Sequence, residues 1–197
     1  MKKPAGAPPQ EVRLLGGQWK RSKLPVAERP GLRPTPSRVR ETLFNWLGQD
    51  LTGWRGLDAF AGTGALGFEA ASRGAREVAM VEQDPTLVVQ LQTIRTRLKA
   101  EAVRVQRGDG LAALRAAAGQ GLDVVFLDPP FDAVNLFEPA LRAAREAVSA
   151  EGFVYLEAPR PWTESELAPL GLTLHRHGRA GAVAFHLLHP ALPGATG

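Results

Sequence analysis

The sequence predicts an α/β domain built on a seven-stranded, mostly parallel sheet that ends in an antiparallel hairpin. Apolar, strand-like runs alternate with helical segments from Gly56 onward, and strands separated by helices are typical of parallel sheets covered on both faces. The last two strand-like runs are separated only by residues 178–181. That stretch is too short for a crossover helix, so these two strands should pair antiparallel.

The expected elements follow one another in a regular order. Residues 11–25 favour two short strands around Gly16 and Gly17, which we expect to form a small N-terminal β-hairpin. Thr35 and Pro36 form a good helix start, with Thr35 as the N-cap residue, and apolar residues at helical spacing extend this helix to about residue 51. The remaining strands are expected at 56–61, 77–82, 102–107, 122–128, 152–157, 172–177 and 182–188, and the helices at 65–74, 85–100, 110–119 and 134–149.

The composition is that of a folded, cysteine-free protein with an uneven charge. Hydrophobic residues make up 44% of the 197 residues, and the net charge is +4. Residues 1–40 hold ten Lys and Arg against two Glu, whereas the remainder has fourteen basic and eighteen acidic residues. A basic segment on an acidic body favours a polyanionic partner, most simply a nucleic acid. The absence of cysteine excludes disulfides, thiolate metal sites and cysteine nucleophiles.

We expect three parts along the chain: a basic tail with the hairpin at 1–34, the α/β domain at 35–189 and a flexible tail at 190–197. The sequence has no apolar run long enough to span a membrane, and no apolar run follows the N-terminal lysines, so we expect a cytoplasmic location. Four histidines near the C-terminus lack carboxylates at ligand spacing, and we expect no metal site there.

A glycine-rich loop follows the first strand of the sheet. Gly62, Gly64 and Gly67 match the spacing of nucleotide-binding loops, in which glycines let the backbone turn tightly and approach a ligand near a helix N-terminus. This pattern alone fits NAD and S-adenosylmethionine equally, and it also fits a tight turn that binds nothing.

Three carboxylates at strand ends distinguish between these ligands. Glu82 can accept hydrogen bonds from ribose hydroxyls, and Asp58 would repel a pyrophosphate but attract a cationic amino-acid group. Asp109 follows the third strand, within expected reach of an adenine amine. S-adenosylmethionine carries a sulfonium, an ammonium, a ribose and an exocyclic amine, so the three carboxylates together favour it. The predicted cofactor-binding residues are Asp58, Phe60, Ala61, Gly62, Thr63, Gly64, Glu82, Gln83, Asp109, Gly110 and Asp128.

The sequence Asp-Pro-Pro-Phe at 128–131 ends the fourth strand at the same edge of the sheet. Asp128 and the carbonyl of Pro129 could accept the two hydrogens of a nucleobase amine, which favours its attack on a methyl group. Pro130 stiffens the turn without adding an N–H donor, and Phe131 would stack on the base. We predict that these four residues are the catalytic group of a nucleobase amino methyltransferase. Taken alone, the turn also fits a rigid strand end with a buried phenylalanine.

These motifs together resemble the class I S-adenosylmethionine-dependent methyltransferases, which have a Rossmann-like fold. Within that class, the Asp-Pro-Pro-Phe box is typical of enzymes that methylate amino groups. Residues 33–47 (RPTPSRVRETLFNWL), 15–19 (LGGQW) and 23–25 (KLP) are similar to the bacterial 16S rRNA guanine-N2 methyltransferases of the small-subunit rRNA methyltransferase D family. The resemblance spans about residues 11–188, essentially the whole domain.

This resemblance implies methylation of a single guanine on N2 in 16S rRNA, within an assembled or assembling small subunit. It implies that residues 35–189 form an S-adenosylmethionine-dependent methyltransferase domain, and we expect a monomer. The basic hairpin should grip RNA phosphates, and the segment before the first helix should lie over the cofactor and the nucleotide. The residues predicted to contact RNA are Lys20, Arg21, Lys23, Arg33, Thr35, Arg38 and Arg40.

Three other functions stay open at this point. An adenine-N6 methyltransferase acting on DNA or RNA would share the chemistry of the Asp-Pro-Pro-Phe box. An NAD(P)-dependent oxidoreductase would use the glycine loop, but no hydride-transfer partner accompanies that loop. A noncatalytic RNA-binding module would keep the fold, although the intact carboxylates and box argue against it.

Overall fold

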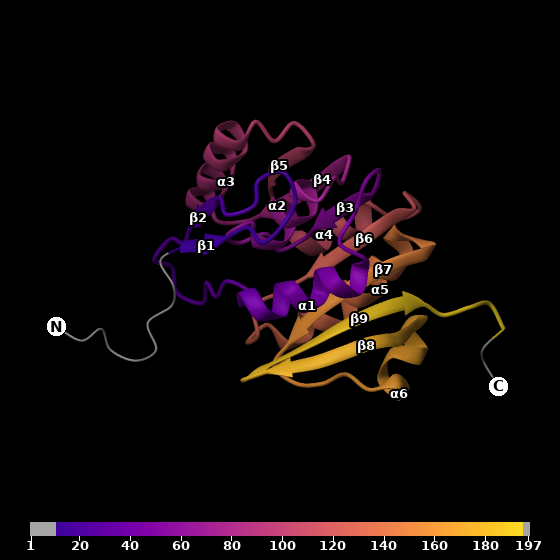
Figure 1. Ribbon diagram of the computed structural model, residues 1–197. Coiled ribbons are helices and arrows are strands. Elements are labelled where there is room, and N and C mark those ends of the chain that lie inside the picture. The colour runs from indigo at the N-terminus through magenta and orange to yellow at the C-terminus, as the bar shows by residue number, and fades with distance from the viewer. Residues whose placement is uncertain (1–10, 195–197) are drawn as a thin grey trace.

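The computed structural model describes residues 11–194 and shows one twisted sheet with helices on both faces (Figure 1). The strand order is β5-β4-β3-β6-β7-β9-β8, in which β9 runs antiparallel to both of its neighbours and the other pairings are parallel. The predicted fold class, including the terminal antiparallel hairpin, is confirmed. The expected tails at 1–10 and 195–197 lie outside the described residues. The strands are β3 (Arg55–Asp58), β4 (Glu77–Glu82), β5 (Val103–Arg107), β6 (Leu122–Leu127), β7 (Val148–Ala158), β8 (Leu172–Ala180) and β9 (Val183–Pro190).

The helices divide between the two faces of the sheet because each face has its own hydrophobic core. On one face, apolar side chains of α1 (Ser37–Leu47), α2 (Ala65–Ser72) and α3 (Pro85–Leu98) form one cluster with the sheet. On the other face, α4 (Gly110–Ala116), α5 (Phe137–Ala147) and α6 (Glu164–Leu167) form the second cluster. Two 3₁₀ turns, Val134–Leu136 and Ala168–Leu170, complete the helical segments. None of the helices within residues 11–194 is long and apolar enough to cross a membrane.

The boundaries predicted for α1 were wrong at both ends. Pro36 occupies the N-cap position without a side-chain capping bond, because the Thr35 hydroxyl donates to Glu157 instead. The helix ends at Leu47, where Gly48 adopts a left-handed conformation with φ 99°, a conformation that favours glycine. The helix is therefore shorter than the expected span, which reached residue 51.

The N-terminal hairpin exists, but its two glycines do not form a tight two-residue turn. β1 (Glu11–Arg13) pairs with β2 (Lys23–Pro25), and residues 14–22 form the connection. Gly17 has φ 74° and packs against the end of α2, where a Cβ atom would lie 1.8 Å from the Ser72 carbonyl oxygen. Both the left-handed backbone and the close approach to α2 therefore favour glycine at this position.

A buried carboxylate ties this hairpin to the domain. Glu69 of α2 is fully buried and accepts backbone N–H bonds from Leu15 (3.0 Å) and Gly16 (2.9 Å). It also pairs with the guanidinium groups of Arg40 (3.2 Å) and Arg73 (3.0 Å). Three apolar residues of the hairpin region belong to the same core as α1 and α2: Val12, Leu14 and Leu24.

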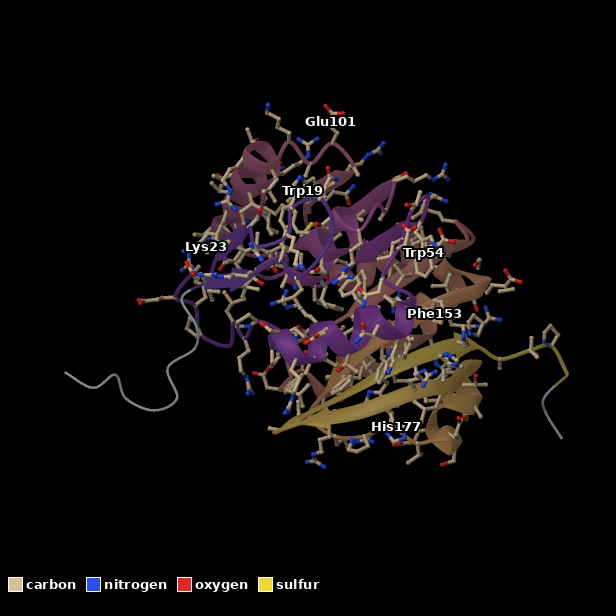
Figure 2. All side chains as sticks on the ribbon, in the orientation of Figure 1. Trp19, Lys23, Trp54, Glu101, Phe153 and His177 are labelled. Carbon is tan, nitrogen blue, oxygen red and sulfur yellow. The ribbon has the colours of Figure 1, made fainter. Side chains whose placement is uncertain are left out.

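An aromatic pair packs at the end of the sheet where the parallel strands begin. Trp54, just before β3, stacks on Phe153 of β7 with ring centroids 6.0 Å apart (Figure 2). Both side chains pack against the core formed by α1, α2 and α3. Apolar packing therefore fills this end, while the opposite end, where the strands terminate, is hollowed.

Candidate active site

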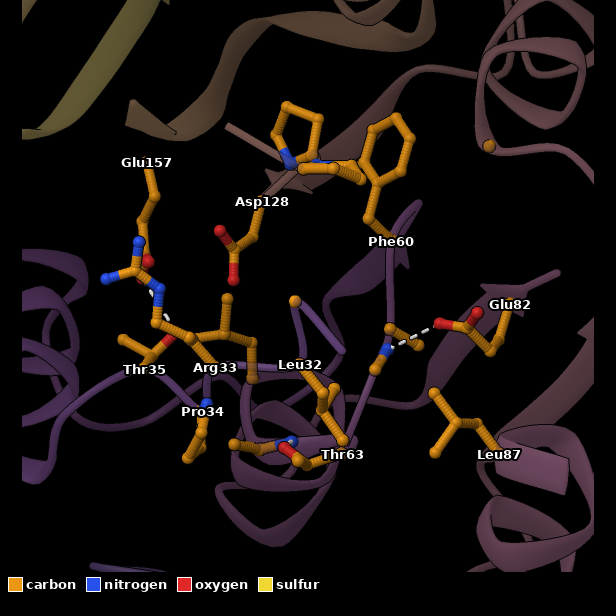
Figure 3. Close-up of a pocket in the computed structure, with 18 of the residues that line it drawn as sticks. Leu32, Arg33, Pro34, Thr35, Phe60, Thr63, Glu82, Leu87, Asp128 and Glu157 are labelled. Carbon is orange, nitrogen blue, oxygen red and sulfur yellow. Dashed lines mark hydrogen bonds between the residues drawn. The ribbon is translucent and has the colours of Figure 1, made fainter. Parts of the chain in front are cut away.

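A cavity of about 710 Å³ opens at the C-terminal edge of the parallel strands (Figure 3). Its walls come from the loops after β3, β4, β5 and β6, from the segment 29–36, from the end of β7 and from the β8–β9 turn. Open α/β sheets bind their ligands at this edge, and pockets of about 300–1,000 Å³ hold small molecules. The predicted cofactor-binding residues that line it are Asp58, Phe60, Ala61, Gly62, Thr63, Glu82, Gln83, Gly110 and Asp128.

Asp58 presents an unpaired carboxylate oxygen at the floor of this cavity. Its side chain is 1% exposed, and Oδ2 accepts a hydrogen bond from the Gly67 N–H at 3.0 Å. Oδ1 is buried and has no hydrogen-bond partner among the residues that the structure describes. Burial raises the pKa of Asp58 to about 7, against the opposing effect of the Gly67 N–H bond. A buried acceptor of this kind is suited to a donor or a cation supplied by a ligand.

Glu82 shapes the glycine loop from the neighbouring strand. Its Oε2 accepts the N–H of Gly62 at 2.9 Å, the contact drawn in Figure 3, and its Oε1 accepts the N–H of Asp84 at 3.0 Å. Gly62 has φ 55°, and Leu32 from the segment 29–36 covers it. Each carboxylate oxygen keeps a second lone pair, so Glu82 can still accept hydrogen bonds from a ligand in the cavity.

Two residues predicted to bind the cofactor, Gly64 and Asp109, are not part of the cavity wall. Gly64 is absent from the cavity wall; it has φ 82°, and a Cβ atom there would lie 2.6 Å from the Phe68 ring and 2.7 Å from Leu91. Asp109 is exposed, also lies outside the wall, and caps α4 by accepting the Ala112 N–H at 2.9 Å. Gly108 and Gly110, on either side of Asp109, do line the cavity, so the contact of Asp109 with an adenine amine stays a prediction.

The Asp-Pro-Pro-Phe turn opens into the same cavity. Asp128, Pro129, Pro130 and Phe131 all line the wall. The carboxyl of Asp128 hydrogen-bonds to that of Glu157, on the adjacent strand β7. Burial, and then the charge of Glu157, raise the pKa of Asp128 well above its ordinary value. The predicted catalytic turn and the predicted cofactor residues thus share one site.

Glu157 is a site residue that the sequence did not single out. It is 3% exposed, lines the cavity, and its Oε1 accepts hydrogen bonds from the hydroxyls of Thr35 (2.7 Å) and Tyr155 (2.8 Å). Burial raises the pKa of Glu157, and the two hydroxyl bonds oppose that rise. The one available signal was a glutamate at the end of an otherwise apolar strand, next in order after the strand that carries Asp128.

The RNA-contacting residues predicted in and just before α1 differ in their exposure to solvent. Arg33 is exposed at the wall, and its guanidinium lies over the Phe131 ring, 5.5 Å from the centroid. Arg38 is exposed. Arg40, in contrast, is 1% exposed and bonds to Glu69 and to the Arg13 carbonyl oxygen. The prediction that Arg40 contacts RNA is wrong, because its guanidinium is used inside the fold.

The basic residues of the hairpin are exposed but lie away from the cavity. Lys20, Arg21 and Lys23 are all solvent-facing, and Lys23 pairs with Glu11 at 3.3 Å. The loop that carries Lys20 and Arg21 bonds to the Ser72 end of α2, whereas the cavity lies at the other end of that helix. Any RNA that contacts both places must extend along this face of the protein.

The described part of the chain, residues 11–194, contains no group of three or more His, Cys, Asp or Glu side chains that could hold a metal ion. His186, one of the four clustered histidines, is buried, with Nδ1 lying 3.2 Å from the Leu156 carbonyl oxygen. Its Nε2 accepts the N–H of Trp162 at 3.0 Å. Both ring nitrogens of His186 are therefore engaged in holding the end of β7 to the following loop.

The strand order, with an antiparallel β9 between β7 and β8, is that of the class I methyltransferase fold. Comparison with known proteins gives the family. The family described as "Conserved hypothetical protein 95" matches residues 12–189. The chain belongs to this family, and its curated relatives include ribosomal RNA small subunit methyltransferases D.

The relatives are similar over almost their whole length. The ribosomal RNA small subunit methyltransferase D of Escherichia coli is 41% identical, over 95% of this chain and 94% of the relative. The protein of the same name from Haemophilus influenzae is 40% identical, over 90% of this chain and 93% of its own. A solved structure of a putative methyltransferase from Escherichia coli is 36% identical, with a TM-score of 0.76 over 92% of this chain and 98% of that structure.

Proposed function

We propose that this protein transfers a methyl group from S-adenosylmethionine to the exocyclic N2 amine of a guanine in 16S ribosomal RNA. The observation that carries this proposal is the meeting of the Asp128–Phe131 turn and the unpaired Asp58 oxygen in one cavity. The names of the relatives support ribosomal RNA as the substrate, and a ribosomal substrate implies a cytoplasmic location.

The residues of the cavity fit the proposed cofactor. The free Oδ1 of Asp58 is suited to a cationic ammonium group, and Glu82 has lone pairs left for ribose hydroxyls. The Gly62 turn lets the backbone approach the ligand closely. When bound, S-adenosylmethionine would supply an electrophilic methyl group whose carbon–sulfur bond breaks as the bond to nitrogen forms, with the electron pair staying on sulfur.

The Asp-Pro-Pro-Phe turn would activate and hold the base. The lone pair of the amine nitrogen forms the new bond to the methyl carbon, and the nitrogen then carries a positive charge until it loses a proton. Asp128 would accept a hydrogen bond from the amine before transfer and take up that proton afterwards, and its raised pKa makes its carboxylate a better base. The carbonyl oxygen of Pro129 is suited to the second amine hydrogen.

The target base would stack on Phe131 after leaving its own stack in the RNA. The Arg33 guanidinium now covers that ring, so binding of the base would require Arg33 to move aside. A displaced Arg33, together with the exposed Arg38, is well placed to contact the phosphates that flank the base. Orientation of base and methyl donor is a large source of rate, on the order of 7–11 kcal/mol in favourable cases.

Transfer of a radiolabelled methyl group tests this proposal. Undermethylated small subunits, naked 16S rRNA and DNA are each incubated with the protein and labelled S-adenosylmethionine, and the products are digested to nucleosides. We expect N2-methylguanosine in the ribosomal RNA. Label in N6-methyladenosine would show the adenine-N6 alternative to be correct, and label in DNA alone would exclude a ribosomal substrate.

Calorimetry separates the methyltransferase from the oxidoreductase alternative. S-adenosylmethionine or its demethylated product should bind, whereas NADH should give no heat of binding because a pyrophosphate would face Asp58 and Glu82. Tight binding of NADH would overturn the assignment of the cavity.

A further inference from the structure

Glu157 and Asp128 lie side by side because their strands are paired. β6 and β7 are parallel neighbours, and Leu127 is in register with Leu156, so the next residues of the two strands are level with each other. Both Glu157 and Asp128 line the cavity, and Figure 3 shows the two carboxyl groups among the residues of its wall. A base whose amine reaches Asp128 can therefore place one of the two ring atoms that flank the amine-bearing carbon beside Glu157.

The hydrogen bonds around Glu157 identify it as the charged member of this pair. Its Oε1 accepts two hydroxyl bonds, from Thr35 at 2.7 Å and from Tyr155 at 2.8 Å. The oxygen that carries the proton of a carboxylic acid is a poor acceptor, and two donors on one oxygen stabilise the carboxylate. The proton that the pair shares in the free protein thus belongs mainly to Asp128, in agreement with the raised pKa of that group.

A carboxylate beside the reactive amine discriminates between the purines. In guanine, the N2 amine adjoins a ring N1 that carries a hydrogen, so the base offers two neighbouring donors. In adenine, the N6 amine adjoins a ring N1 with a lone pair, which would face a carboxylate without any hydrogen bond. A buried site built to accept a hydrogen bond rejects a ligand that lacks the donor, because its acceptor is left unpaired.

We propose that Glu157 determines the specificity for guanine by accepting the N1–H of the target base while Asp128 accepts a hydrogen of the adjoining N2 amine. This inference rests on the function proposed above, and it adds the residue that chooses the base. Thr35 and Tyr155 are positioning residues, because they hold the Glu157 carboxylate through its other oxygen. The two donors of guanine would replace the proton that the carboxyl pair shares in the free protein.

The surrounding charges allow both carboxyls to be ionised when guanine is bound. Arg33 faces Asp128 from the segment before α1, and Arg40 acts on Glu157 from α1 itself. Asp58, on β3, opposes ionisation of Asp128. The positive charge proposed to bind at Asp58 would offset this repulsion, so that the proton leaves the pair when cofactor and base are both present.

A base analogue tests the proposed contact. 2-Aminopurine keeps the exocyclic N2 amine of guanine, but it lacks both the N1 hydrogen and the O6 carbonyl oxygen. Small subunits are reconstituted with 16S rRNA that carries either base at the methylated position, which is mapped first by locating the label in sequence-specific nuclease fragments of the RNA. For the wild-type protein, kcat/KM should be roughly 10- to 100-fold lower on the 2-aminopurine substrate, the range expected for one hydrogen bond to a charged group. A preference for guanine below about threefold would overturn the proposal.

Glu157→Gln tests whether this residue is the cause of the preference. The amide keeps the size of the side chain but cannot supply a carboxylate, so the ratio of the two kcat/KM values should fall toward one. The missing O6 and the intrinsic reactivity of each base are the same for every variant, so a change in the ratio reports the interaction of residue 157 with the base. Glu101→Gln is the control, because Glu101 is exposed in the turn after α3 (Figure 2), and it should keep the wild-type ratio.

Each remaining outcome decides the question. A Glu157→Gln protein that is slower on both substrates but keeps the wild-type ratio would contradict the proposal. If the Glu157→Gln protein transfers no methyl group, the Tyr155→Phe variant tests the proposal in its place. It removes one hydroxyl donor to Glu157 Oε1, so the ratio of kcat/KM on guanine to that on 2-aminopurine should fall roughly 2- to 10-fold. An unchanged ratio in Tyr155→Phe would then overturn the inference. If the wild-type protein labels no guanine, the proposed function itself fails.

Discussion

Two clusters of charged side chains lie close to α1, and they are built in opposite ways. Glu69 is surrounded by opposite charge: it pairs with two buried guanidinium groups and accepts two backbone N–H bonds. Asp128 and Glu157 instead face each other, and the nearest donors to Glu157 are the hydroxyls of Thr35 and Tyr155. The first cluster fixes the hairpin to the domain, whereas the second lines the cavity.

This difference distinguishes a structural cluster from a functional one. A buried charge that is fully paired and hydrogen-bonded can be kept without a ligand, although removing any partner is costly. Two neighbouring carboxyls raise each other's pKa and oppose folding when both are ionised, so such an arrangement is typical of sites that act on a ligand. Asp58, with one unpaired buried oxygen, belongs with the second kind.

Glu69→Ala should have the largest effect on stability, because it leaves the buried guanidinium groups of Arg40 and Arg73 unpaired. We expect the free energy of unfolding, measured by chemical denaturation, to fall by about 3–5 kcal/mol. Glu138→Ala is the control. Its ion pair with Arg142 on α5 is exposed, at 58% and 55% respectively, and should contribute about 1 kcal/mol or less. Similar losses in both variants would remove the distinction between the Glu69 cluster and an ordinary surface pair.

Asp58→Asn should change how stability depends on pH. The folded-state pKa of Asp58, about 7, is raised above its ordinary value of 3.8, so its contribution to stability is complete below pH 4 and is lost as the pH rises through about 7. Asparagine does not titrate. The variant should therefore gain stability relative to the wild type between pH 5 and 8, by on the order of 1–3 kcal/mol. Denaturation curves at several pH values measure this difference in stability between the two proteins. A difference that is the same at every pH would show that burial does not raise the pKa of Asp58.

Charge reversal of Lys20, Arg21 and Lys23 should have the smallest effect per residue. These exposed side chains lie away from the cavity, so we expect weaker RNA binding with little change in the transfer rate at saturating substrate. For every phosphate that the protein no longer neutralises, the slope of log affinity against log salt should fall by about 0.7–0.9. Arg142→Glu, on the opposite face of the sheet, should leave the slope unchanged. An unchanged slope in the triple variant would mean that the hairpin does not touch RNA.

The sheet, its terminal hairpin and the cavity edge could be predicted because they depend on local patterns. Alternation of strands and helices fixes a parallel sheet, and parallel strands deliver their final residues to one edge. Asp58, Glu82 and Asp128 each follow or end such a strand, so their convergence follows from the order of elements alone. The edge of the sheet at which these residues meet can therefore be predicted from the periodicity of the sequence, without knowing how the side chains pack.

The roles of Arg40 and Glu157 depend on partners that no local pattern specifies. Arg40 looks like one more cation in a basic segment, but Glu69 on another helix buries it. Asp109 lies at a strand end like Glu82, yet the first turn of α4 takes its carboxylate. Glu157 becomes a neighbour of Asp128 only through the pairing of β6 with β7. Long-range packing decides the positions of Arg40 and Glu157, whereas the bond between Asp109 and Ala112 is a local helix cap.

Asp128→Ala tests most directly whether the carboxyl pair is the reaction centre. Transfer of a labelled methyl group to undermethylated small subunits and calorimetric binding of S-adenosylmethionine are measured on the same preparation. We predict that transfer falls at least about 100-fold, as for loss of a group that stabilises developing charge, while cofactor affinity changes by less than about threefold. Transfer at a rate near that of the wild type, or a loss of cofactor affinity as large as the loss of transfer, would contradict the role assigned to Asp128.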